Sequence, residues 1–156
     1  MDASLAAQVI AYLQSHQVMV LATHGEQGVW ATAVFYVSDG FDCYFLSAAH
    51  TRHAQNLAVT GWASAAIQEE YKDWQAIQGI QMEGDVALLA GDERERAMQL
   101  YWQKFPFLAQ PVPEIAEALA KVGWYRLRPL RLYFIDNTKG LGHREELFNH
   151  LSASDS

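Results

Sequence analysis

The sequence predicts a mainly β protein in which an antiparallel sheet curves into a barrel and helices flank it. Most of the predicted strands are joined by short turns, which favours antiparallel pairing. One strand, residues 29–37, is apolar on both faces, as expected of a barrel strand that a helix or a second subunit covers. The chain has 156 residues, of which 51% are hydrophobic. We therefore expect one domain over residues 1–150 and a disordered tail over 151–156.

Composition argues against several classes of function. The net charge is -7 and no long basic run is present, so neither nucleic acid nor an anionic membrane is expected as the main partner. No apolar run reaches the roughly 18 residues that a membrane helix needs, and the N-terminus lacks the basic segment of a signal peptide. Cys43 is the only cysteine, so no intramolecular disulfide can form. These observations indicate a cytoplasmic protein.

The first part of the chain is predicted as a helix followed by three strands. Apolar residues at three- and four-residue steps indicate a helix over 2–16. Short runs rich in aliphatic and aromatic residues predict strands over 18–23, 29–37 and 41–47. A Ser-Asp-Gly turn at 38–40 predicts that the second and third of these strands form a hairpin.

The middle of the chain is predicted as a helix between strands. Thr51 can cap a helix that ends near Gly61. Strands are predicted over 62–68 and 76–90. The second of them contains glycines, including Gly84, which suggest a bulge or a close approach of another group.

The C-terminal part is predicted as two helices and a final strand. Asp92 and Glu95 form the pattern of a capping box, and the helix that follows must end at Pro106. A second short helix is predicted over 114–122, and the last strand over 124–136.

The segment around Thr51, Arg52 and His53 is the first candidate site. Backbone N–H groups in the first turn of a helix have no intrahelical partner, so this turn can bind an anion. Basic side chains are usually unfavourable at a helix N-terminus unless an anion lies between them and the N–H groups. The pattern therefore suggests a bound phosphate, and the alternative is a surface helix that carries an unrelated Arg and His.

Other motifs do not predict catalysis. His50 and His53 could share a helix face, but no third ligand is indicated and we expect no metal site. Gly140 and Gly142 lack the third glycine of a dinucleotide-binding turn, and the Gly-x-Ser-x-Gly pattern of a hydrolase is absent. Gln81 belongs to a polar row on its strand, which faces either water or the polar edge of a ligand.

Several segments, in this order, carry a resemblance to a known family: Gly-Val-Trp-Ala-Thr-Ala-Val-Phe-Tyr at 28–36, Cys-Tyr-Phe-Leu-Ser at 43–47, Thr-Arg-His-Ala-Gln at 51–55, Gly-Ile-Gln-Met-Glu-Gly at 79–84, and Asp-Asn-Thr at 136–138 with Gly-x-Gly at 140–142. Together they resemble the FMN-binding split barrels that are similar to pyridoxamine 5′-phosphate oxidase. The match is closer to the YhbP-like branch of that superfamily, and it extends over about residues 5–147.

The resemblance implies a six-stranded antiparallel Greek-key split barrel and a homodimer with FMN in a cleft between the subunits. It implies that Arg52 and His53, beside Thr51, hold the phosphate, and that Arg144 comes from the partner subunit. The full set of cofactor-binding residues that it implies is Ala31, Thr32, Ala33, Val34, Phe35, Tyr36, Leu46, Ser47, Thr51, Arg52, His53, Gln81 and Arg144.

This sequence departs from the superfamily at two positions. His53 stands where a Lys is frequent, and His is largely neutral above about pH 6.5, which would weaken the hold on FMN. Tyr36 stands where the oxidase has a lysine, so the oxidase's substrate is not carried over. The resemblance implies an FMN-dependent oxidoreductase of unknown small-molecule substrate. The alternatives are a non-catalytic flavin- or haem-binding dimer and a barrel that has lost its cofactor and serves as a binding module.

Overall fold

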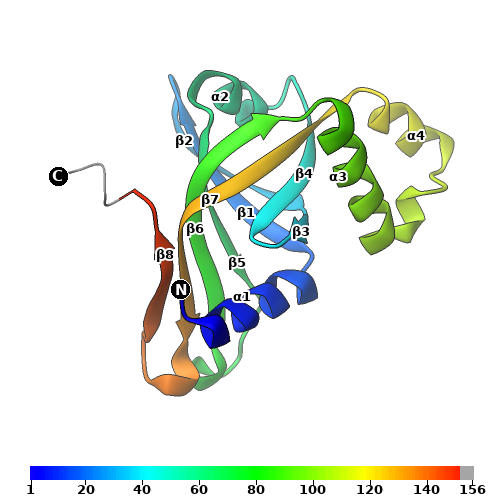
Figure 1. The fold of residues 1–156 in the computed structure, drawn as a ribbon. Coiled ribbons are helices and arrows are strands. Elements are labelled where there is room, and N and C mark those ends of the chain that lie inside the picture. Colours follow the sequence, from blue (N-terminus) through cyan, green and yellow to red (C-terminus); the bar gives the residue numbers. More distant parts are fainter. Residues whose placement is uncertain (152–156) are drawn as a thin grey trace.

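The computed structural model describes residues 1–151 as a curved antiparallel sheet with helices around it (Figure 1). No helix in this part of the chain is both long and apolar enough to span a bilayer. The helices and strands are α1 (Ala3–Ser15), β1 (Val18–Gly25), β2 (Gly28–Phe35), β3 (Val37–Asp39), β4 (Asp42–Ala48), α2 (Arg52–Thr60), β5 (Trp62–Gln68), β6 (Gln78–Leu88), α3 (Gly91–Lys104), α4 (Pro113–Leu119), β7 (Val122–Asp136) and β8 (Arg144–Asn149).

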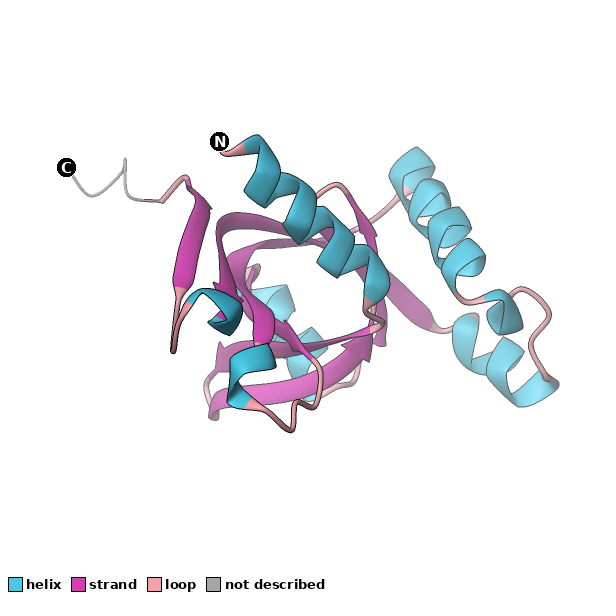
Figure 2. Cartoon of the chain, turned by 90° about the horizontal axis from the view of Figure 1, so that it is seen from below, coloured by secondary structure: helices cyan, strands magenta, loops and turns pink. Residues whose placement is uncertain are grey.

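The sheet curls until its two ends meet. Its strand order is β2-β1-β5-β6-β7-β4-β3, and all pairs are antiparallel. The strands at the two ends of this order, β2 and β3, are separated in the chain by Tyr36 alone. Counted as one interrupted strand, they close a barrel of six strands, seen end-on in Figure 2, with β8 added outside. The predicted split barrel is therefore confirmed, although the interruption and β8 raise the strand count to eight.

The barrel splits along β7. One edge of β7 pairs with β6 over nearly its whole length, whereas the other edge pairs first with β4, at 122–127, and then with β8, at 131–135. Pro129 lies at the change of partner and has no N–H to donate to a neighbouring strand. Opposite it the register shifts at Gly84, where a Cβ would lie 2.0 Å from the Arg128 carbonyl oxygen. The glycine in this predicted strand is thus required by a close backbone approach.

The predicted hairpin between residues 29–37 and 41–47 forms only in part. The β2 strand pairs along its full length with β1, and only the three residues of β3 pair with β4. The change occurs at Tyr36, which is fully buried and donates from its hydroxyl to the Leu13 carbonyl oxygen at 2.6 Å. Alternation of residue types did not reveal that this tyrosine interrupts the strand.

Helix α1 covers one open end of the barrel, across which it lies in Figure 2. The Asp2 side chain accepts hydrogen bonds from the Ser4 and Leu5 amides and so caps the helix. Leu5, Val9 and Leu13 are buried among the inward-facing side chains of the strands. The predicted amphipathic helix therefore contributes directly to the barrel core.

Helix α3 packs outside the barrel, against β3, β4 and β7. Its buried residues Ala97 and Tyr101, together with Phe105, form a second core cluster with Trp124 of β7. The predicted capping box does not form, since the helix begins at Gly91 with no side-chain cap. Helix α4 ends at Leu119, three residues before the predicted end.

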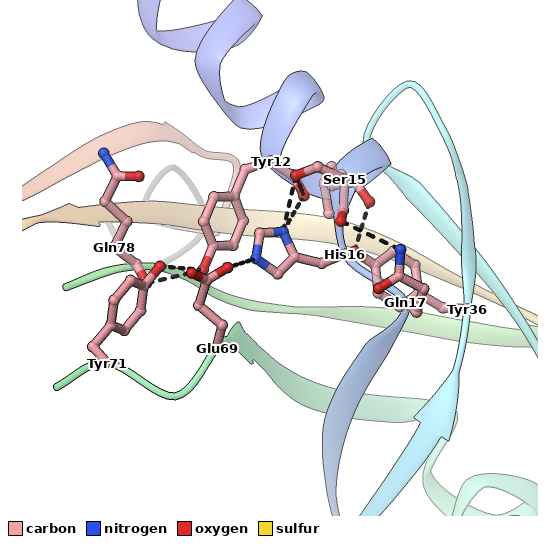
Figure 3. Close-up of polar contacts among 9 residues, drawn as sticks. Tyr12, Ser15, His16, Gln17, Tyr36, Glu69, Tyr71 and Gln78 are labelled. Atoms are coloured by element: carbon pink, nitrogen blue, oxygen red, sulfur yellow. Dashed lines mark hydrogen bonds and ion pairs between the residues drawn. The ribbon is translucent and has the colours of Figure 1, made fainter. Parts of the chain in front are cut away.

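A polar network joins the end of α1 to the segment after β5 (Figure 3). The His16 ring lies with Nδ1 2.8 Å from the Tyr12 carbonyl oxygen and Nε2 2.8 Å from Glu69 Oε2. The Tyr12 hydroxyl donates to the Gln78 carbonyl oxygen at 3.0 Å and lies 3.2 Å from the Tyr71 hydroxyl. These contacts fix the helix over the barrel end.

Candidate cofactor site

The start of α2 has the geometry that its sequence predicts. Thr51 is the N-cap, and its Oγ1 accepts from the Ala54 amide at 3.3 Å and donates to the Ala48 carbonyl oxygen at 2.8 Å. The helix ends at Gly61, which has a left-handed φ of 61° that favours glycine. The backbone amides of Arg52 and His53 lie in the first turn, where no helical carbonyl precedes them as an acceptor. They can therefore donate hydrogen bonds to an anion.

Arg52 is held on the turn between β1 and β2. Its Nη2 donates to the Gln27 carbonyl oxygen at 2.9 Å, and its guanidinium carbon lies 4.5 Å from the centre of the Trp30 ring. Its Nε is buried and makes no hydrogen bond within residues 1–151. A ligand cannot reach this enclosed nitrogen, but the side chain is only partly buried, and its terminal amino groups carry further hydrogens for an acceptor such as a phosphate oxygen.

His53 points into the protein rather than toward the helix start. It is buried, with Nε2 2.6 Å from Ser47 Oγ and 3.4 Å from Thr51 Oγ1. Burial lowers the pKa of this imidazole below its ordinary value. The neutral ring therefore links the end of β4 to α2, and Arg52 carries the positive charge at this helix start.

The other predicted residues of this region differ in their accessibility. Ala31 and Phe35 of β2 are exposed, whereas Thr32 and Val34 are partly buried and Tyr36 is enclosed in the barrel. Leu46 pairs in register with Trp124, and it packs on the cluster under α3. The structure thus brings Ser47, Thr51, Arg52 and His53 together, and it directs the Tyr36 and Leu46 side chains elsewhere.

Gln81 and Arg144 meet on the outer face of the barrel. Arg144 Nη1 donates to Gln81 Oε1 at 3.3 Å, and the guanidinium carbon lies 4.2 Å from the centre of the Tyr133 ring. Both side chains line a cavity of about 340 Å³ over β1, β5, β6, β7 and the start of β8, which we call the outer cavity. No residue of β2 or α2 lines it, so within one chain the predicted cofactor residues divide into two separate groups.

Two lining residues of this cavity were not singled out from the sequence. Arg131 and Tyr133 pair in register with Glu83 and Gln81, which places all four side chains on one face. Arg131 Nε lies 3.4 Å from Glu83 Oε1. The period-two spacing of Arg131 and Tyr133 was the available signal, but only the register between β6 and β7 shows that they face the same cavity as Gln81.

An apolar surface adjoins the cavity. Val18, Val20 and Ala22 of β1 pair in register with Phe35, Ala33 and Ala31 of β2, and Val20 pairs on its other side with Ala66 of β5. Val18, Val20 and Phe35 are 42%, 44% and 51% exposed. We call these seven residues the outer apolar face: Val18, Val20, Ala22, Ala31, Ala33, Phe35 and Ala66.

The sequence profile of the family described as pyridoxamine 5′-phosphate oxidase matches residues 5–136. The chain belongs to this family. A UPF0306 protein of Klebsiella pneumoniae is 30% identical over 135 residues, which make up 85% of this chain and 86% of that protein. UPF0306 protein YhbP of Escherichia coli is 29% identical with the same coverage. These relatives support the predicted YhbP-like branch of the pyridoxamine 5′-phosphate oxidase superfamily.

Solved structures share the fold of this family member at lower identity. A haem-binding protein from Mycobacterium smegmatis has a TM-score of 0.74 at 22% identity, over 95% of this chain and 58% of that one. The chain thus spans less than two thirds of that protein. HutZ, a haem storage protein from Vibrio cholerae, has a TM-score of 0.65 at 19% identity, over 79% of this chain and 88% of that one. Similarity at this level shows a common fold.

Proposed function

We propose that this protein is a homodimer that binds FMN between its subunits and acts as a flavin-dependent oxidoreductase. The observation that carries the proposal is the division of the family's cofactor residues into two groups within one chain. The start of α2, with Arg52, lies beside the turn between β1 and β2, whereas Gln81 and Arg144 lie in the outer cavity. One cofactor reaches both groups if each comes from a different subunit.

The first group suits a phosphate monoester. The terminal amino groups of the partly buried Arg52 can donate to a phosphate oxygen, and the Thr51-capped helix adds its first-turn amides. His53 would act through position, because its ring is neutral and bonded to Ser47. Bound FMN would supply the redox chemistry, while these side chains bind and orient it.

The outer apolar face supports the dimer. An exposed apolar surface that is rimmed by polar residues is typical of a protein interface. A second copy seated on this face would cover Val18 and Phe35, which are about half exposed in the single chain, and would border the cavity at Val20. It would also bring the start of its own α2 toward the cavity of the first subunit.

Haem binding is the second candidate, since two proteins of the same fold carry that description. His24 is exposed near the end of β1 and pairs in register with Val29, so it is available as an axial ligand. The absorbance spectrum of the purified protein separates the candidates: a flavin spectrum supports the first, and a Soret band supports the second.

An FMN titration of Arg52→Ala tests the phosphate site. Losing one charge-assisted contact costs about 1.5–3 kcal/mol, so FMN affinity should fall roughly ten- to hundred-fold. Quenching of flavin fluorescence measures it. Riboflavin, which lacks the phosphate, should bind the wild type and the variant equally.

The matched control is Arg94→Ala, because Arg94 lies on α3 and pairs only with its neighbour Glu95 among the described residues. Its FMN affinity should equal that of the wild type. If Arg52→Ala also binds FMN like the wild type, the phosphate site is not at this helix start.

A further inference from the structure

We propose that the outer cavity also binds a small planar anion, an aromatic carboxylate, through Arg131 beside the cofactor residues Gln81 and Arg144. That the cavity serves as a substrate pocket rests on the proposed function. Binding of the anion itself needs only the cavity. Arg131, Glu83 and Tyr133 carry it, and none of them belongs to the residues that the family resemblance assigns to FMN.

The charge of the cavity is opposite to that of the protein. The chain carries a net charge of -7, yet the charged groups that line the cavity among residues 1–151 are two arginines and one carboxylate, Glu83. The guanidinium of Arg144 is fixed by its bond to Gln81 and by the ring of Tyr133. The lining thus carries one net positive charge, which favours an anion.

Arg131 is only loosely paired. Glu83 Oε1 lies 3.4 Å from its Nε, but Nε is buried and makes no hydrogen bond in the described part of the chain. An arginine that is satisfied by a carboxylate commonly makes two parallel hydrogen bonds to it. Protein atoms enclose this Nε, so the donors that Arg131 offers to a ligand carboxylate are the terminal amino groups of a side chain that is 35% exposed. Glu83 would compete with the ligand for this side chain.

The size of the cavity indicates a small ligand, and its apolar wall suits a ring. Its volume of about 340 Å³ lies at the lower end of the range for small-molecule pockets. Its opposite wall is apolar and includes Val20, Ala22 and Ala66 of the outer apolar face. A ring against this wall would direct its carboxylate toward the arginines, and a second copy on the apolar face would border the same cavity.

Salicylate, a fluorescent aromatic carboxylate, is the probe, and the full chain is titrated with and without FMN. Arg131→Gln should weaken salicylate binding at least about tenfold, as expected for the loss of a charge-assisted contact. Glu83→Gln removes the competing carboxylate and should tighten binding. Both variants break the same ion pair, so a merely structural effect would move them in the same direction.

The matched control is Arg128→Gln, because Arg128 lies on the same strand, is exposed and pairs with Asp42 outside the cavity. It should bind salicylate like the wild type. Salicylamide, the neutral analogue, should bind Arg131→Gln and the wild type equally.

The two proposals fail separately. The salicylate affinity of Arg131→Gln is compared with that of the wild type without FMN, and the FMN affinity of Arg52→Ala is compared without salicylate, so neither result depends on the other ligand. If wild-type protein does not bind salicylate at millimolar concentration, or if Arg131→Gln and the wild type bind it equally, the cavity is not an anion site.

Discussion

At the scale of single residues, burial makes two basic side chains less basic. His53 is enclosed between β4 and α2, and desolvation lowers its pKa. Lys104, the last residue of α3, donates from Nζ to the His16 carbonyl oxygen and lies 4.3 Å from the centre of the Tyr36 ring. Desolvation lowers the pKa of this ammonium group from 10.5 to about 8. Both groups therefore make folding stability depend on pH.

Lys104 gives a pH dependence whose sign follows from its lowered pKa. Between about pH 8 and 10.5 the unfolded chain holds more protons on this lysine than the folded chain does. The free energy of unfolding should therefore rise with pH in this window, relative to Lys104→Met. Urea denaturation of both proteins at pH 7, 8 and 9 measures the difference, and the other titrating groups largely cancel in it. A difference that stays constant over this range would show that the ammonium is not desolvated.

At the scale of elements, α1 is the helix whose packing the sequence predicted best. Its core residues Leu5, Val9 and Leu13 recur every four positions, and the structure buries them in the barrel core, at the end that α1 covers. Helix α2 was also predictable, because Thr51 and Gly61 define its ends through contacts within the segment itself. Strand β8 was missed, since Arg144–Asn149 begins with charged residues and pairs with a distant edge of β7. Helix caps that depend on neighbouring residues can be predicted from the sequence, whereas the pairing of a strand with a distant sheet edge cannot.

Leu13→Ala tests how much α1 contributes to stability. Leu13 is fully buried, so removing most of its side chain should cost about 2–5 kcal/mol, depending on how far the cavity collapses. Gln14→Ala is the control, because Gln14 is the exposed neighbour on the same helix. Denaturant unfolding measures both, and equal midpoints for the two variants would mean that α1 is peripheral to the fold.

At the scale of the whole molecule, the sequence predicted the fold and one half of the candidate site. The motif from Thr51 to His53 is contiguous, so its place at a helix start followed from the sequence alone. The cavity required the register that pairs Gln81 with Tyr133 and Glu83 with Arg131, and periodicity does not contain that register. The inward direction of His53 also depends on Ser47, which comes from another element. Contacts between elements were therefore the part that sequence reasoning could not supply.

The proposed homodimer depends on the outer apolar face, so Val20→Glu should disrupt it. Wild-type protein should sediment as a dimer at micromolar concentration, with a buried interface well above about 2,000 Å². Val20 lies in the middle of the face, where an unpaired buried carboxylate would cost several kcal/mol, so the variant should be monomeric. Val59→Glu, an exposed valine on α2, should remain dimeric. A monomeric wild type would refute the shared site.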